Sequence, residues 1–224
     1  MSVSLLQPAA FLNRLGITLS LVEKYLLKHG WRVRDVYDDA TRVFLTLATR
    51  EAESEDDAVL LRYPKPTYRY EHLDIAAYCA ALLDRLAELE AVSRPEIEAR
   101  VRATFDETLP GYACRQCGHC CRELRDAHQG RVSYEEVEVW RALGLGRLLS
   151  FVKEEKGQGY SFYTAWVHPK SGKHFRKCPW LCKVDGEARY FCRIHAVKPL
   201  KCRAFPLWRE QAERVGCPGV ALLG

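Results

Sequence analysis

The sequence predicts an α+β protein in which a small α/β N-terminal unit precedes an irregular, metal-stabilised cysteine-rich domain of short helices and hairpins. Nine of the ten cysteines follow residue 113, and Pro110-Gly111 interrupts a helical pattern just before them. We therefore expect an accessory or docking unit over residues 1–105 and a metal-binding domain over 106–224. A chain of 224 residues is long enough for two small domains with real cores.

The first 105 residues predict helices packed with strands. Thr18 can cap a helix over residues 19–30, and Ser93 with Glu96 has the spacing of a capping box at the start of another. Cys79 lies on the apolar stripe of a long helix, where a cysteine usually packs as a small hydrophobe. The long helix covers residues 73–92, and three strand-like runs cover 31–37, 42–50 and 58–64.

The second half predicts shorter elements. Ser133 and Glu136 form a capping box ahead of two short helices separated by glycines. Residues 161–178 predict a hairpin that turns at 170–172, and 180–195 predict a second one that turns at Asp185-Gly186. A helical turn and a proline stop follow.

Chain composition limits the compartment and the class of protein. The sequence has no run of 18 uncharged apolar residues that would cross a membrane, and its N-terminus lacks the basic start of a secretory signal. These features predict a cytoplasmic protein without membrane association. Because the cytoplasm is reducing, clustered cysteines there are metal-binding or catalytic more often than disulfide-bonded.

Four cysteines fall within eight residues: Cys114, Cys117, Cys120 and Cys121. The vicinal pair and the tight spacing are poor geometry for disulfides. A Cys-x₂-Cys redox motif would need only two cysteines at a helix start. Metal binding is favoured, since thiolates at a spacing of three can turn around one ion or cluster. Five later cysteines can complete the shell: Cys178, Cys182, Cys192, Cys202 and Cys217.

Two kinds of metal site fit this pattern. Structural zinc takes four Cys or His ligands in a tetrahedron, and two zinc ions can share a bridging thiolate. Iron–sulfur clusters often use a Cys-x₂-Cys-x₂-Cys run with a remote cysteine near a proline, and CRAFP at Cys202 has that form. The spacing favours iron–sulfur slightly over zinc.

The residues that carry chemistry resemble a known family. CRQCGHCC at 114–121, CPWL at 178–181 and CRIHAVKPLKCRAFP at 192–206 resemble the YkgJ-like cysteine-cluster family, a zinc- or iron-chelating family, over about residues 113–207. His195 stands where many members have tyrosine. The resemblance leaves open whether His119, His195, Cys182 or Cys217 is a ligand. The ligands it implies are Cys114, Cys117, Cys120, Cys121, Cys178, Cys192 and Cys202.

Charge is uneven between the halves. Residues 1–105 carry 14 Lys and Arg against 16 Asp and Glu, a net charge of −2, whereas 106–224 carry 20 against 13, a net charge of +7. A basic half can bind nucleic acid, but it can equally offset the negative charge of a thiolate site.

We expect a metal-binding protein with a redox, metal-handling or iron-dependent modification role, and the sequence assigns no enzyme activity. Flagellin lysine methylases have a related cysteine cluster, but no glycine-rich nucleotide loop here supports methyl transfer. The alternative is a zinc-stabilised module without catalysis. It would bind a protein partner through residues 1–105 or a nucleic acid through the basic half.

Overall fold

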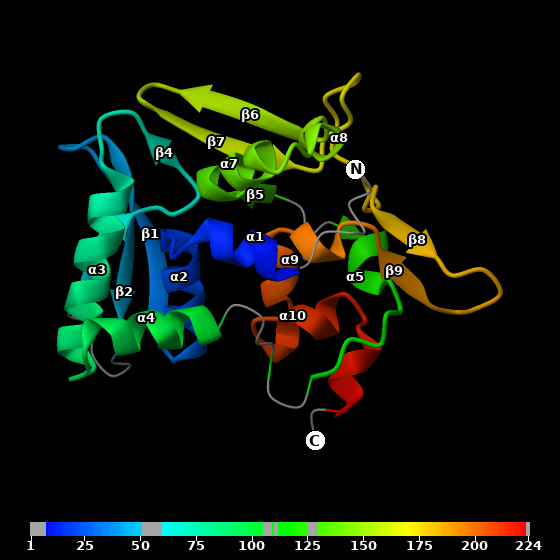
Figure 1. Cartoon of the computed structure of the whole chain (residues 1–224), viewed down its shortest axis with the longest axis horizontal. Helices are drawn as coiled ribbons and strands as arrows, with labels where there is room; N and C mark the ends of the chain where they lie inside the picture. Colours follow the sequence, from blue (N-terminus) through cyan, green and yellow to red (C-terminus); the bar gives the residue numbers. More distant parts are fainter. Residues whose placement is uncertain (1–7, 51–59, 105–108, 110–111, 125–129, 223–224) are drawn as a thin grey trace. The chain divides into compact units, whose positions relative to one another are not determined.

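The computed structural model describes residues 8–50, 60–104, 109, 112–124 and 130–222. It has helices and antiparallel strands in an α+β fold, as predicted (Figure 1). The chain packs as two compact units. The sheet unit comprises the described residues of 17–106 and 156–162, and the cysteine unit those of 1–16, 107–155 and 163–224. The units therefore differ from a division at residue 105 in two segments. The described N-terminal residues up to 16 belong to the cysteine unit, and residues 156–162 belong to the sheet unit.

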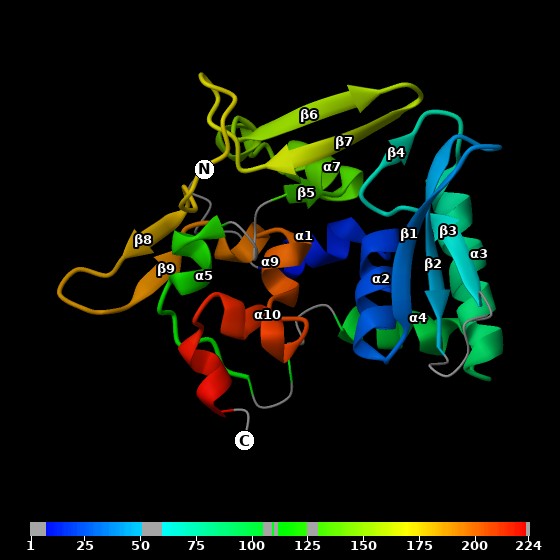
Figure 2. The same cartoon turned by 180° about the vertical axis from the view of Figure 1, so that it is seen from behind.

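The sheet unit is a three-stranded antiparallel sheet between two helices. The sheet has the order β1-β2-β3, so β2 is central and is buried along most of its length. In both views α2 covers one face and α3 the other (Figures 1 and 2). These elements and α4, which packs on both helices, span Leu19–Lys28 (α2), Arg32–Asp38 (β1), Val43–Thr49 (β2), Leu61–Pro64 (β3), Ile75–Leu89 (α3) and Arg94–Ala103 (α4).

Local sequence signals determine where these helices begin. The Leu21 N–H donates to the Thr18 hydroxyl at 3.3 Å, and the Glu96 N–H donates to the Ser93 hydroxyl at 3.4 Å. Each cap satisfies a backbone donor that the first helical turn leaves free, which stabilises a helix by about 1 kcal/mol. Cys79 is buried on α3, and this confirms its prediction as a core cysteine.

The helix α1 (Pro8–Leu15) and nearly all elements that follow α4 belong to the cysteine unit. The two short helices predicted after Ser133 are α7 (Tyr134–Ala142) and α8 (Gly146–Leu149), and the Ser133–Glu136 capping box is present. The predicted turn at Asp185-Gly186 joins β8 (Leu181–Lys183) to β9 (Tyr190–Cys192). The remaining elements of the unit are α5 (His119–Arg122), β5 (Gly130–Val132), η2 (His195–Val197), α9 (Leu200–Ala204), α10 (Arg209–Arg214) and η3 (Pro218–Leu222).

The hairpin predicted over 161–178 is wrong in its pairing. The strand β7 (Tyr160–Ala165) pairs with the preceding β6 (Val152–Gly157), and the turn at 170–172 closes only a single bridge between Val167 and His174. At its start β7 also pairs with β4 (Arg69–Tyr70), and there the rings of Tyr68 and Tyr160 lie 5.2 Å apart. The two-residue turn at Gln158-Gly159 thus joins β7 to β6 as a local hairpin, and β7 pairs in addition with the distant strands β4 and β5.

Glu136 connects α7 to the segment that carries the last predicted ligand. Its carboxylate accepts from the Ser133 N–H at 2.9 Å and from the Leu200 N–H at 2.7 Å, and it is fully buried. Burial raises the pKa of Glu136, while the two backbone donors oppose that rise. Trp140 adds a second link, because its Nε1–H donates to the Val197 carbonyl at 3.0 Å. The Glu136 contact holds the start of α9 (Leu200–Ala204) against α7, and the Trp140 contact holds η2 (His195–Val197) against it.

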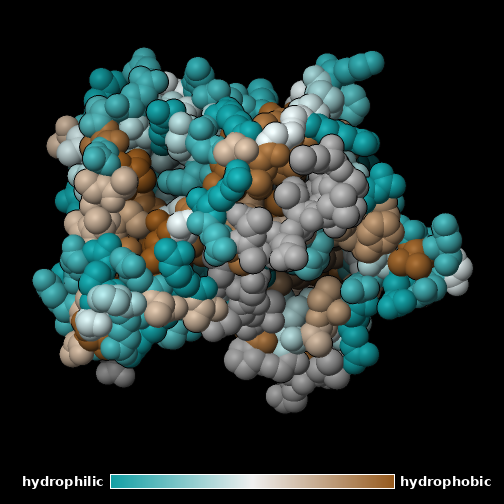
Figure 3. Space-filling view, in the orientation of Figure 1, coloured by the Kyte–Doolittle hydropathy of each residue, from teal (hydrophilic) through white to brown (hydrophobic). Residues whose placement is uncertain are grey.

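The surface drawn in Figure 3 is mostly hydrophilic, with a few apolar side chains among the polar ones. The large hydrophobic side chains that stay exposed in the described residues are Tyr37, Tyr78, Phe191 and Trp208. In the same part of the chain, no helix has the length and apolar character needed to cross a bilayer.

Candidate metal centre

The cysteine run is held against the β8–β9 hairpin. The Tyr190 N–H donates to the Gln116 carbonyl at 2.8 Å. Gly118 then enters α5 with a positive φ of 72°, and a Cβ at this position would lie 2.9 Å from the Tyr190 ring. A glycine is therefore needed both for the backbone angle and for the close approach. As a result, Cys120 and Cys121 lie on a single turn of helix beside β9 (Figures 1 and 2).

Cys121 is the neighbour of a cysteine from a distant segment. The Cys178 N–H donates to the Cys121 carbonyl at 2.7 Å. A hydrogen bond between the two thiols is the largest cause of the raised pKa of Cys178, and burial is the second. The Sγ atoms of Cys120 and Cys121 are 3.9 Å apart. The end of the run and the CPWL segment therefore meet.

Cys192 and Cys202 lie close to the same thiol. Burial raises the pKa of Cys192 to about 11 and that of Cys202 to about 12, and the negative charge of the Cys121 thiolate raises both further. Lys198 opposes the rise at both sulfurs, and Lys201 opposes it at Cys202. The structure thus brings together four cysteines from four segments: Cys121, Cys178, Cys192 and Cys202.

Several sulfurs receive a backbone hydrogen bond from two residues further along the chain. The His119, Trp180 and Ile194 backbones each lower the pKa of the cysteine two positions before them. Those cysteines are Cys117, Cys178 and Cys192. An N–H directed at sulfur favours the thiolate, which is the form that binds metal. Hydrogen bonds to sulfur are also a means by which proteins tune iron–sulfur and zinc sites.

Lys201 is a half-buried cation beside these thiols. Its ammonium group donates to the Gly130 carbonyl at 2.9 Å, and burial lowers its pKa. Cys202, Glu136 and Cys178 act in the opposite direction, because their negative charges favour the protonated amine. Thiolates at this site would therefore have a compensating positive charge within the fold.

The first part of the cysteine run lies beside Cys217, and the sequence left undecided whether Cys217 is a ligand. The Tyr112 hydroxyl lies 3.3 Å from the Cys217 sulfur, and Cys120 packs in the same apolar cluster as Cys217. Burial is the first cause of the raised pKa of Cys117, and the Cys217 and Cys114 thiolates contribute to it. Cys114 itself is exposed. The only sequence signal for Cys217 is its place in a tight Gly-Cys-Pro-Gly turn.

The remaining candidate ligands lie at the edge of the cysteine site or outside it. His119 Nδ1 is 2.8 Å from the Gly216 carbonyl, which makes this exposed side chain part of a structural contact. His195 is exposed on η2. Cys182 is half-buried on β8 and is only the last and smallest of the causes that act on the pKa of Cys192.

A cluster of aromatic rings lies around Trp180. Trp180 follows Cys178 closely and is buried, with its ring 6.1 Å from Trp166 and 5.2 Å from Phe151. The Nε1–H groups of Trp166 and Trp180 are buried and have no hydrogen-bond partner among the described residues. These rings form a largely buried apolar cluster that includes the residue two positions after Cys178.

The chemistry of this donor set fits a thiophilic metal, but the geometry is open. Within the described residues, no three or more His, Cys, Asp or Glu side chains are arranged so that they could hold an ion. A metal ion could be held here only if the sulfurs moved closer together. All ten cysteines are free thiols.

No family model, curated protein or solved structure matches this chain. The resemblance to the YkgJ-like family therefore rests on the spacing and identity of the motif residues.

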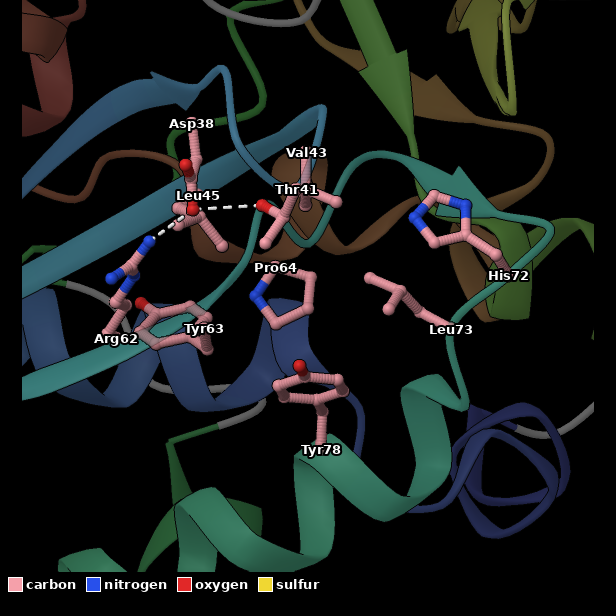
Figure 4. Close-up of a pocket in the computed structure, with 10 residues that line it drawn as sticks. All are labelled: Asp38, Thr41, Val43, Leu45, Arg62, Tyr63, Pro64, His72, Leu73 and Tyr78. Atoms are coloured by element: carbon pink, nitrogen blue, oxygen red, sulfur yellow. Dashed lines mark hydrogen bonds and ion pairs between the residues drawn. The ribbon is translucent and has the colours of Figure 1, made fainter.

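The sheet unit has a separate hollow of about 530 Å³ (Figure 4). Val43, Leu45 and Pro64 give it an apolar side, and Tyr78 faces them from α3. Its charged residues at neutral pH, Asp38 and Arg62, already form an ion pair with each other. The hollow thus offers apolar contact area without an arranged nucleophile and base, which is more typical of binding than of catalysis.

Proposed function

We propose that this chain binds metal through the thiols of its cysteine unit, as an iron–sulfur centre or as zinc. The observation that carries the proposal is the meeting of Cys121, Cys178 and Cys202, with Cys192, from four separate segments. Burying that many thiols together raises their pKa values, so each thiolate is costly until a cation is present. Metal binding supplies that cation and couples the loss of thiol protons to folding.

The family resemblance implies the wider ligand set, and the surroundings of the sulfurs are consistent with it. Backbone N–H groups that reach Cys117, Cys178 and Cys192 would hold thiolates in place. Lys201 would offset part of their negative charge. An iron–sulfur centre would supply electron transfer or assist an iron-dependent modification, while zinc would supply structural stabilisation. We place this role in the cytoplasm, where free thiols persist.

Metal analysis tests the proposal directly. The full chain is purified without oxygen, and iron, zinc and acid-labile sulfide are measured per chain together with the visible spectrum. Iron and sulfide in comparable amounts with a brown colour identify a cluster, and zinc without sulfide identifies a zinc protein. A chain that contains neither metal, and that takes up neither on anaerobic reconstitution, overturns the proposal.

A zinc-stabilised binding module is the second candidate, and the hollow of the sheet unit favours it. In that case zinc would be found without sulfide, and the basic cysteine unit would serve a partner. Binding to nucleic acid must weaken steeply between about 50 and 200 mM salt, because it releases counterions from phosphates. Undetectable or salt-insensitive binding to single- and double-stranded probes would remove the nucleic-acid form of this candidate.

A further inference from the structure

We infer that Cys217 is an eighth metal ligand, and that the thiols form two separate four-thiolate centres rather than one seven-thiolate site. This inference rests on the proposed function and extends it. The first centre takes the first three cysteines of the run and Cys217, and the second takes the last cysteine of the run and the three downstream ones. The sets are Cys114, Cys117, Cys120 and Cys217 for the first centre, and Cys121, Cys178, Cys192 and Cys202 for the second.

The turn that carries Cys217 is packed against the start of the run on both sides of the cysteine. Before it, the Gly216 carbonyl lies 2.8 Å from His119 Nδ1. After it, a Cβ on Gly219 would lie 2.7 Å from both the Ala113 carbonyl oxygen and the Tyr112 ring. These contacts hold the turn at the cysteine run, so the position of Cys217 there does not depend on its own side chain.

The Cys217 side chain then points into the same small cluster as the run. It is buried with Phe205, Ala212 and Val220, and Tyr112 and Cys120 pack against this group. The Tyr112 hydroxyl is 3.3 Å from the sulfur and can donate a hydrogen bond to a thiolate there. Cys117 lies near enough for the Cys217 and Cys114 thiolates to raise its pKa. A buried thiol with a hydrogen-bond donor and two cysteine neighbours, Cys117 and Cys120, has the surroundings of a ligand.

The adjacent cysteines Cys120 and Cys121 separate the two centres. They are consecutive on α5, and consecutive helical residues point in directions about 100° apart. Cys120 packs into the Cys217 cluster and also lies near Cys121 and Cys202. Cys121 is joined to Cys178 through both backbone and thiol. The 3.9 Å between their sulfurs lets two centres be neighbours while each keeps its own ligands. Four thiolates are the usual complement of one zinc ion or one [4Fe–4S] cluster.

Metal stoichiometry in single cysteine variants tests this division. Cys217→Ser and Cys114→Ser each remove one thiol of the first centre, Cys202→Ser removes one of the second, and Cys182→Ser is the matched control outside both sets. All are purified or reconstituted without oxygen, metal and sulfide are measured per chain, and circular dichroism monitors folding. We expect Cys217→Ser and Cys114→Ser each to lose about half of the metal, because each abolishes one of two equal centres. Cys202→Ser should lose the other half, and Cys182→Ser should lose none.

The double variants decide between separate centres and a shared one. Cys114→Ser with Cys217→Ser should lose no more metal than either alone, whereas Cys217→Ser with Cys202→Ser should lose nearly all of it. Full metal content in Cys217→Ser overturns the inference but leaves the proposed function intact. Loss of all metal in each single variant of either set, with the fold retained, also overturns it and indicates one joint site. Absence of metal in the unaltered chain instead refutes the proposed function.

Discussion

The Cys178 N–H donates to the Cys121 carbonyl at 2.7 Å, and this bond joins the end of the cysteine run to the start of the CPWL segment. The two residues are far apart in the chain, yet their thiols also interact. A backbone bond between two candidate ligands limits how far apart they can lie. Under the proposed function, this bond would partly preorganise the site, and metal binding would bring the sulfurs closer.

Metal removal is expected to loosen the cysteine unit and leave the sheet unit folded. The β8–β9 hairpin has only three residues in each strand, and so short a hairpin is marginal without further support. The sheet unit has its own core, in which Leu26, Ala48 and Leu86 are completely buried. Amide hydrogen exchange with and without an anaerobic chelator should show faster exchange at the Cys178 amide, with Leu26 and Ala48 still protected. Unchanged protection at Cys178 after verified metal loss would contradict this.

Tyr112→Phe is expected to weaken one centre without emptying it. The substitution removes the hydroxyl 3.3 Å from the Cys217 sulfur and keeps the ring that packs beside it. Loss of a hydrogen bond to a ligand typically lowers metal affinity about 10-fold or more. Competition with a chelator should therefore release half of the metal more readily than in the unaltered chain. Tyr78→Phe, exposed in the sheet unit, is the control, and equal release from both variants would rule out a role for the Tyr112 hydroxyl.

Gly118→Ala should destabilise the cysteine unit more than Gly172→Ala. Both glycines have a positive φ, 72° and 66°, so alanine costs each about 1 kcal/mol in backbone strain. Only at Gly118 would the new methyl group also press on a ring, that of Tyr190, whereas at Gly172 it would meet open space. We expect an additional loss of roughly 1–2 kcal/mol for Gly118→Ala, measured by denaturation of the metal-loaded protein. Equal losses would show that the run can move away from β9 without cost.

Local signals in the sequence predicted the helix starts correctly, because a cap at Thr18 or Ser133 needs only its own next three residues. The pairing of β7 was mispredicted because the tight turn at Gln158-Gly159 joins it to β6, and its further partners, β4 and β5, come from distant segments that no local pattern identifies. Spacing likewise singled out the cysteine run, but it left Cys217 open. Cys217 comes close to Tyr112 because the turn at 216–219 folds back onto residues 112 and 113, a contact between segments far apart in the chain.

Stability of the sheet unit is expected to fall as the pH rises toward 7, because of Glu23. The pKa of Glu23 is raised to about 7, first by burial and then by the nearby Asp35 carboxylate, while Lys65 opposes the rise. The Tyr63 ring also lies close, and its buried hydroxyl has no hydrogen-bond partner among the described residues. A carboxyl whose pKa is higher in the folded state contributes stability below its unfolded pKa. That contribution is lost as the pH rises through the folded value.

The Glu23→Gln variant tests this assignment, because glutamine resembles the protonated carboxyl and does not titrate. Between about pH 4.5 and pH 7 the unaltered chain should lose on the order of 2 kcal/mol that Glu23→Gln retains. Urea denaturation of the metal-loaded protein, followed by exchange at sheet-unit amides, measures the difference at each pH. Glu88→Gln on the exposed side of α3 should follow the unaltered chain. Parallel pH profiles for Glu23→Gln and the unaltered chain would mean that Lys65, which also pairs with Asp35, keeps Glu23 charged when folded.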